Sequence, residues 1–361
     1  MNMKLTRKSI IAIALAIFCI LLHLLCNNKF WVEHYYSNGF FLWFSKILRI
    51  SLGSIPFSIG DILYALVFSW LIWMFFKWVR NSIKKKGSGK TIKSRLVSFF
   101  IFCTIVYLVF NIFWGVNYNR KGIAFQMQLD IKKYDSADLK TLNGILLDKI
   151  NSTKQVVEQN KISYSDNDKL FSIAIDAYKN AAVLHPFLKY ENPSIKSSQW
   201  GWLGNYLGFT GYYNPFTGEA QVNTTVPKTL LPFVCCHEIA HQIGYAKERE
   251  ANFVGFLVAN ASNDTLLKYS AYLDLFLYAN RNLYLYDSTS AKLYRDQLSP
   301  LVKKDIIELV KFNKSHQNII EPVITKLYNF FLINNQQPQG MMSYDEVTGF
   351  IIAYYKKYGS I

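Results

Sequence analysis

The chain has 361 residues, of which 51% are hydrophobic and 16% aromatic, and its formal net charge is +16. The charge is uneven: residues 1–116 hold 14 basic and 2 acidic side chains, a net charge of +12, whereas residues 117–361 hold 26 and 22, a net charge of +4. Seven of the basic residues crowd into 80–95, a stretch without interleaved aromatic side chains that could stack on bases. The composition therefore argues against a nucleic-acid-binding protein.

Three apolar runs in the first third of the chain predict membrane-spanning helices. They cover residues 9–26, 62–79 and 96–115, and each is close to the roughly 20 residues that a helix needs to cross about 30 Å of hydrocarbon. The first run follows Lys4, Arg7 and Lys8, as a signal peptide would, but its end, HLLCNN, offers no small residue before a cleavage point. We expect it to remain as an anchor, so that 1–116 forms an α-helical transmembrane region.

The basic residues also predict an orientation. Short loops rich in Lys and Arg stay in the cytoplasm, which places the loop at 80–95 inside and the chain after the third span outside. The sequence thus predicts a multi-pass protein of a bacterial-type inner membrane, with an extracytoplasmic domain at 117–361 and the lipid bilayer as a partner. In the outer loop, the stretch FFLWFSKILRISLGSIPF (40–57) predicts an interfacial or re-entrant helix.

The outer domain shows mostly helical patterns with one extended region. Residues 136–159 and 168–184 have helical spacing of apolar side chains, and the chain after Ala246 is again helical, ending with a helix at 344–358. Between them, 209–213 and 219–225 alternate in character around a turn at 214–218, which predicts a hairpin. We therefore expect a mainly α, α+β domain with a small antiparallel sheet. The hairpin is either purely structural or provides an edge strand that pairs with an extended peptide beside a cleft.

The stretch CCHEIAHQIGYAKEREANF (235–253) carries the chemistry. Pro232 suits a first helical turn and Gly244 suits the position just past a helix end, which predicts a helix at 233–243. His237 and His241, four residues apart, project from one face and can bind one Zn²⁺. Glu238 is placed to act as a general base on a water at the open metal position.

A third protein ligand is expected after this helix, and two glutamates qualify. Glu248 and Asn252 are four apart on one face of the next helix, so Glu248 can reach the metal while Asn252 hydrogen-bonds a histidine ligand. Glu250 is the alternative third ligand.

The HEIAH motif followed by EREAN resembles the gluzincin branch of the zincin metallopeptidases, in which a His-Glu-x-x-His helix precedes a helix bearing Glu-x-x-x-Asp. The resemblance implies a zincin-like fold with His237, His241 and Glu248 as ligands, Glu238 as the base and Asn252 in place of the Asp. HEIAHQIGYAK is also similar to the metzincin pattern, but Lys247 stands where that pattern has its last histidine, and an ammonium cannot bind a metal. The chain further resembles an uncharacterised family of bacterial membrane proteins whose outer domain carries NPFTGEAQVN-like and CHEIAHQ-like segments.

Amide hydrolysis also calls for a donor that stabilises the oxyanion. The candidates are Tyr212, Tyr213, Arg281 and Tyr344. Taken together, the sequence predicts a membrane-anchored zinc metallopeptidase that acts on peptide or protein substrates. The alternative is a catalytically silent zinc-binding module with a sensory or interaction role. The sequence leaves the substrate and the oligomeric state open.

Overall fold

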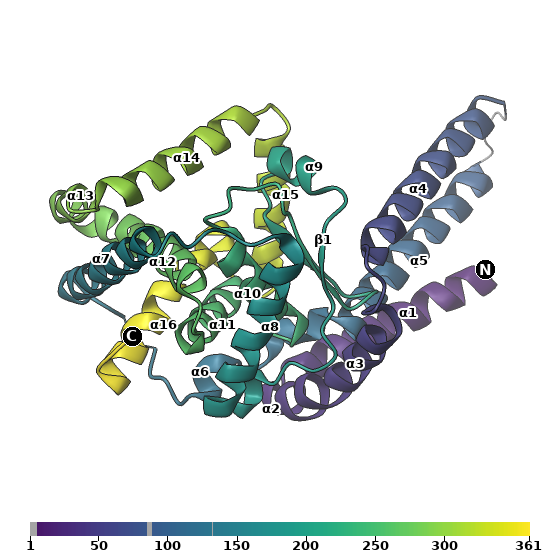
Figure 1. The fold of residues 1–361 in the computed structure, drawn as a ribbon. Coiled ribbons are helices and arrows are strands. Elements are labelled where there is room, and N and C mark those ends of the chain that lie inside the picture. Colours follow the sequence, from purple (N-terminus) through teal and green to yellow (C-terminus); the bar gives the residue numbers. More distant parts are fainter. Residues whose placement is uncertain (1–5, 85–88, 132) are drawn as a thin grey trace.

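The computed structural model describes residues 6–84, 89–131 and 133–361, and it consists of three long apolar helices and a helical domain (Figure 1). The long helices are α1 (Arg7–Cys26), α4 (Ile59–Lys84) and α5 (Gly89–Phe113). Stretches long and apolar enough to cross a membrane lie at Arg7–Cys26, Ile59–Asn81 and Ser94–Phe113, where the sequence predicts spans. Residues 85–88 of the predicted basic loop lie outside the described residues. The orientation in the membrane stays a prediction.

The segment between the first two spans packs on the domain. It contains α2 (Lys29–Trp31), a π-helical stretch η1 (Val32–Phe40) and α3 (Phe41–Leu52). Phe41, Ser45 and Arg49 share one face of α3 and are buried. The Arg49 guanidinium donates to the backbone carbonyls of Glu191 and Gln242, each at 3.2 Å. The stretch predicted at 40–57 therefore contains a helix, over Phe41–Leu52, and one face of it docks the membrane region onto the domain. Its interfacial or re-entrant placement stays a prediction.

The helices predicted in the domain are present. Helix α7 (Ser136–Gln159) has the predicted bounds and begins with a capping box between Asp135 and Asp138, and α8 (Asn167–Leu184) is capped by Asp166. The other helical segments are η2 (Gly115–Asn119), α6 (Ile123–Gln126), η3 (Pro186–Leu188), α9 (Gly201–Leu207), α10 (Leu231–Gln242), α11 (Glu248–Ala261), α12 (Thr265–Tyr286), α13 (Ser288–Asp296), α14 (Pro300–His316), α15 (Glu321–Asn334), η4 (Gly340–Tyr344) and α16 (Val347–Tyr358).

The sheet is small and mixed, so the prediction of an antiparallel sheet was wrong. The predicted hairpin is formed by β2 (Gly211–Asn214) and β3 (Glu219–Val222), which pair antiparallel around a turn that ends at Gly218 with φ +69°. A third strand, β1 (Ile195–Ser197), pairs parallel to β3, giving the order β1-β3-β2. Three residues are too few to show a period of two, so the sequence pattern does not reveal β1. The order leaves β2 at an edge.

Helix α10 lies in the centre of the domain core. It packs on β3, α8, α11 and α12, and all its side chains except that of His237 are buried. Its two thiols, Cys235 and Cys236, are free and buried among the core residues. The helix that carries the motif is thus held on every side by the fold, which fixes the positions of its polar residues.

Candidate metal centre

The helix α10 begins and ends where its sequence predicts, within two residues. Pro232 lies in its first turn, and Gly244 follows its end with φ +97°. A Cβ at this glycine would lie 3.1 Å from the Phe41 ring and 3.2 Å from the Arg120 guanidinium. The left-handed turn and the close neighbours both require glycine. This turn lets α11 start four residues later, with Glu248 beside the two histidines.

His237, His241 and Glu248 form a largely buried cluster, in which the His237 side chain is 11% exposed. Their candidate ligand atoms all lie within 4.8 Å of one another. The Glu248 carboxylate Oε2 lies 3.2 Å from His237 Nε2 and 3.3 Å from His241 Nε2. Within the described part of the chain, this is the one group of three or more His, Cys, Asp or Glu side chains with such spacing.

The hydrogen bonds of the histidines fix their tautomers. His237 Nδ1 lies 2.7 Å from Asn252 Oδ1, and His241 Nδ1 lies 2.7 Å from the Tyr245 carbonyl. Both oxygens are acceptors, so in the neutral rings each Nδ1 carries the proton and each Nε2 turns its lone pair toward Glu248. Asn252 therefore holds the position next to a histidine that the sequence predicts for it.

The cluster attracts positive charge. Burial lowers the pKa of His241, but the charge and hydrogen bond of Glu248 outweigh it and raise that pKa to about 9. Burial by itself raises the pKa of Glu248, but the charges and hydrogen bonds of the two histidines lower it by more, so the pKa lies well below its ordinary value. Three electron-pair donors that converge in a buried site need a cation or a proton between them.

A tyrosine that the sequence analysis missed completes the surroundings of Glu248. The Tyr328 hydroxyl on α15 donates to Glu248 Oε1 at 2.8 Å and lies 3.3 Å from the Tyr344 hydroxyl. It is one of 24 tyrosines and lies 80 residues away along the chain. No local signal distinguishes it, because only the packing of α15 brings it to the cluster.

Glu238 lies beside the cluster with an unused carboxylate oxygen. Its side chain is buried, and Oε2 has no hydrogen-bond partner among the described residues. Burial raises the pKa of Glu238 to about 7; the two histidines lower it and Glu248 raises it. A Cβ at Gly211, on the edge strand β2, would lie 2.5 Å from Glu238 Oε1. Glu238 thus lies directly against the start of β2.

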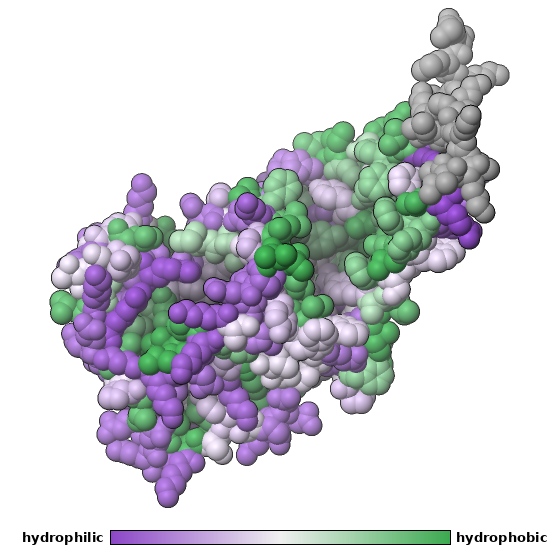
Figure 2. Space-filling model, turned by 90° about the horizontal axis from the view of Figure 1, so that it is seen from above, coloured by the Kyte–Doolittle hydropathy of each residue, from purple (hydrophilic) through white to green (hydrophobic). Residues whose placement is uncertain are grey.

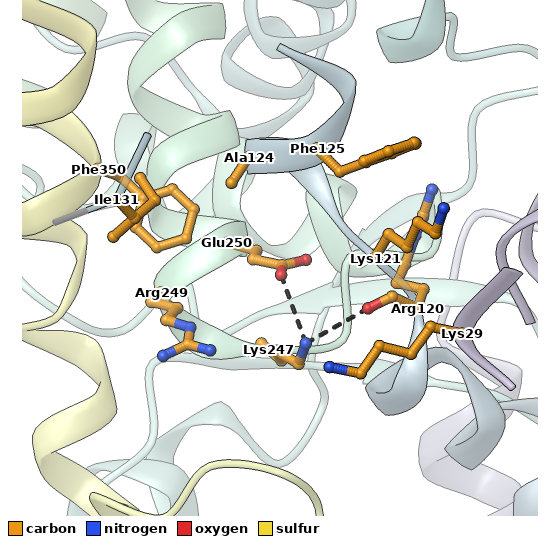
Figure 3. Close-up of a pocket in the computed structure, with 10 residues that line it drawn as sticks. All are labelled: Lys29, Arg120, Lys121, Ala124, Phe125, Ile131, Lys247, Arg249, Glu250 and Phe350. Carbon is orange, nitrogen blue, oxygen red and sulfur yellow. Dashed lines mark hydrogen bonds and ion pairs between the residues drawn. The ribbon is translucent and has the colours of Figure 1, made fainter. Parts of the chain in front are cut away.

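The alternative third ligand, Glu250, does not join the histidines. Figure 3 shows its carboxylate in a different pocket, together with Lys29, Arg120, Lys121, Lys247 and Arg249. Its Oε1 lies 3.6 Å from Lys247 Nζ, and a Cβ at Gly122 would lie 2.2 Å from the same oxygen. The side chain points away from the cluster because neighbouring helical positions project in different directions.

The structure separates the four candidates for the oxyanion donor. Tyr344 stacks on the His237 ring, with centroids 6.3 Å apart. The Tyr212 hydroxyl donates to Asp61 at the start of α4. Tyr213 packs on Trp114, with ring centroids 4.6 Å apart, and its buried hydroxyl has no partner in the described residues. Arg281 pairs with Asp345. Only Tyr344 has both its ring and its hydroxyl beside the cluster.

Comparison with known proteins gives a family but no activity. The model of the family described as "Protein of unknown function (DUF3810)" matches residues 36–352. The chain belongs to the DUF3810 family. The match covers the second and third candidate spans, in α4 and α5 (the span hairpin), and nearly all of the domain, so the span hairpin and the cluster are parts of one DUF3810 unit. Searches of curated proteins and of solved structures found no match to this DUF3810 chain.

Proposed function

We propose that the chain is a membrane-anchored, zinc-dependent metallopeptidase of zincin-like fold that cleaves peptide or protein substrates outside the cytoplasm. The observation that carries the proposal is the largely buried cluster of His237, His241 and Glu248, with the unpartnered Oε2 of Glu238 beside it. The positive-inside pattern of the basic residues supports the extracytoplasmic placement.

The donor set fits zinc. Two imidazole nitrogens and one carboxylate oxygen are a common ligand set of catalytic zinc sites, which keep a fourth position open. Donor atoms about 2.1 Å from one tetrahedral zinc stand about 3.4 Å apart, and the Glu248 oxygen lies 3.2 and 3.3 Å from the two histidine nitrogens. When bound, zinc would polarise a substrate carbonyl and acidify a water molecule.

Glu238 is proposed as the general base. Burial raises the pKa of this carboxyl to about 7, and a base is most effective when its pKa lies near the working pH. Its free Oε2 can accept a proton from water and return it to the leaving amine. The neighbouring strand β2 would hold an extended peptide along its edge, with the scissile bond near Gly211. Of the tyrosines, Tyr344 is the one we propose as the oxyanion donor.

One observation favours the alternative of a silent zinc-binding module. Glu238 and His241 are only 3% and 8% exposed, and closed, buried sites are typical of structural zinc. The intact glutamate beside the cluster favours catalysis, because a structural site has no use for an unpaired buried carboxylate.

The test compares the full chain with Glu238→Gln in lipid nanodiscs. Both proteins are loaded with zinc and incubated with a peptide library whose cleavage is followed by mass spectrometry. We expect equal zinc contents and a rate that falls by about 10²–10⁴-fold in Glu238→Gln. Equal cleavage by the two proteins would rule out Glu238 as the base. Bound zinc without any cleavage by the wild type would favour the silent module.

A further inference from the structure

An apolar surface covers α9, α15 and the loop before α15. Ile319 in that loop is 91% exposed and Phe330 on α15 is 68% exposed. Soluble proteins rarely leave such large apolar side chains together in water. We call this the α9–α15 surface, and its other members are Trp202, Leu203, Tyr206, Ile320, Val323 and Leu327, all substantially exposed.

The exposure of the loop is built into the fold. The Asn318 amide donates to the Tyr206 carbonyl at 2.7 Å, which ties the loop to α9. Its Oδ1 accepts from the backbone N–H groups of Ile320 and Glu321 at 2.8 and 3.0 Å. These bonds hold the chain in an arrangement in which Ile319 and Ile320 face outward. The exposure of the two isoleucines therefore follows from the hydrogen bonds that fix the loop.

The α9–α15 surface adjoins the spans. The Phe331 ring on α15 lies 5.9 Å from the ring of Phe110 in the last turn of α5. Figure 2 shows a hollow between the span hairpin and the domain, with apolar side chains on both of its sides. The apolar exterior of the spans thus continues across the hollow onto the domain.

The chemistry of the surface matches the border of a bilayer. Tryptophan and tyrosine favour the level of the lipid headgroups, and α9 carries Trp202 and Tyr206 at this surface. Lys314 and Lys326 lie close by in the chain and are exposed, where they can meet phosphate groups. A soluble protein partner would not explain why the apolar area continues that of the spans.

We propose that the α9–α15 surface inserts into the leaflet that the domain faces, so that the bilayer covers it. Tyr328, on the same helix, donates to Glu248, so the inserted helix also borders the metal cluster. If the proposed function holds, on which this last step rests, the site opens at the membrane surface. Its substrates are then polypeptides that are themselves anchored in the membrane.

The test uses the full chain with a photoreactive benzoylphenylalanine at single positions, in nanodiscs of labelled phosphatidylethanolamine and phosphatidylglycerol. Ile319 and Phe330 are the test positions. Phe68, in α4 and 65% exposed, is the positive control, and Leu293, on the distant α13 and 55% exposed, is the matched negative control. Each variant is checked for an unchanged thermal unfolding midpoint before illumination, so a misfolded variant is recognised.

We expect lipid adducts at Ile319 and Phe330, as at Phe68, and no lipid adduct at Leu293. Absence of lipid adducts at both test positions, with the Phe68 adduct present, would overturn the proposal. Adducts with a second polypeptide in place of lipid would overturn it too. The readout needs no hydrolysis, so it stands or falls separately from the proposed peptidase activity.

Discussion

In the cluster of His237, His241 and Glu248, the two histidines depend on different parts of the chain for their orientation. His241 is oriented by the Tyr245 carbonyl, four residues on, whereas His237 is oriented by Asn252 on α11. The spacing of the motif predicts both histidines and Asn252, because these relations are local to one helical hairpin. To choose between Glu248 and Glu250 one must know the direction of α11, which the sequence does not provide. The contact of Tyr328 with Glu248 depends on the packing of α15, which the sequence does not provide either.

The role of Tyr328 gives a prediction for a single hydroxyl. Tyr328→Phe removes the donor to Glu248 Oε1 and keeps the ring. Groups that hydrogen-bond a metal ligand typically contribute about 10–100-fold to metal affinity, so we expect zinc affinity to fall within that range in a competition titration with a chromophoric chelator. Tyr272→Phe is the control, because it removes a buried tyrosine hydroxyl on α12 that donates to Asn260 Oδ1 at 2.8 Å, away from the cluster. Unchanged affinity in Tyr328→Phe would show that the hydroxyl does not support the ligand.

At the level of elements, the site is the junction of α10 with the edge strand β2. Turn residues and the alternation of 209–225 predict the hairpin, because both signals are local. The parallel strand β1 escaped prediction because its pairing with β3 joins residues more than twenty positions apart. The edge position of β2 follows from that pairing. From the sequence alone the hairpin is therefore either purely structural or the source of an edge strand for a peptide.

The contact between β2 and Glu238, the proposed base, gives a second prediction. In Gly211→Ala the new Cβ would lie 2.5 Å from Glu238 Oε1 and 2.8 Å from the Gln221 carbonyl, so the carboxylate or the strand must move. We expect peptide hydrolysis to fall by about 10²-fold, the effect of misplacing a catalytic group by about 1 Å, with zinc content unchanged. Gly144→Ala on α7, where the nearest atom would be 3.7 Å away, is the control. Full activity in Gly211→Ala would argue against Glu238 as the base.

At the level of the whole molecule, the membrane region and the domain share buried polar contacts. Arg120 and Glu33 form an ion pair at 2.8 Å with side chains 2% and 8% exposed. Glu219 on β3 accepts from the backbone N–H of Gly60 at 2.6 Å, at the start of α4. Residues on the two sides of the predicted boundary at 116 therefore pack against each other through buried polar contacts. Charge patterning could place the spans, but it could not show that the segment after the first span docks on the domain.

The buried pair of Glu33 and Arg120 predicts a pH dependence of stability. Burial raises the pKa of Glu33, but the hydrogen bond and charge of Arg120 outweigh it, so the pKa lies below its ordinary value of 4.5. Its contribution to stability is present above that value and is lost as the pH falls through the lowered pKa. Glu33→Gln should cost roughly 3–5 kcal/mol near neutral pH, as for one partner of a buried pair.

Thermal unfolding of the full chain in detergent at several pH values tests this. The difference between wild type and Glu33→Gln should be largest near neutral pH and should narrow below pH 4.5. Glu191→Gln, which alters a solvent-exposed pair with Lys46, should change little. A difference that stays constant as the pH falls would contradict the account of the pair.

The central claim is that His237, His241 and Glu248 bind one zinc ion, and metal content measures it most directly. The full chain would be purified beside Glu248→Gln and Glu250→Gln, two changes of the same chemistry two residues apart, and zinc would be counted per chain by mass spectrometry. The account predicts one zinc in the wild type and in Glu250→Gln, and its loss in Glu248→Gln. Zinc that is absent from the wild type, or that is lost only in Glu250→Gln, would contradict it.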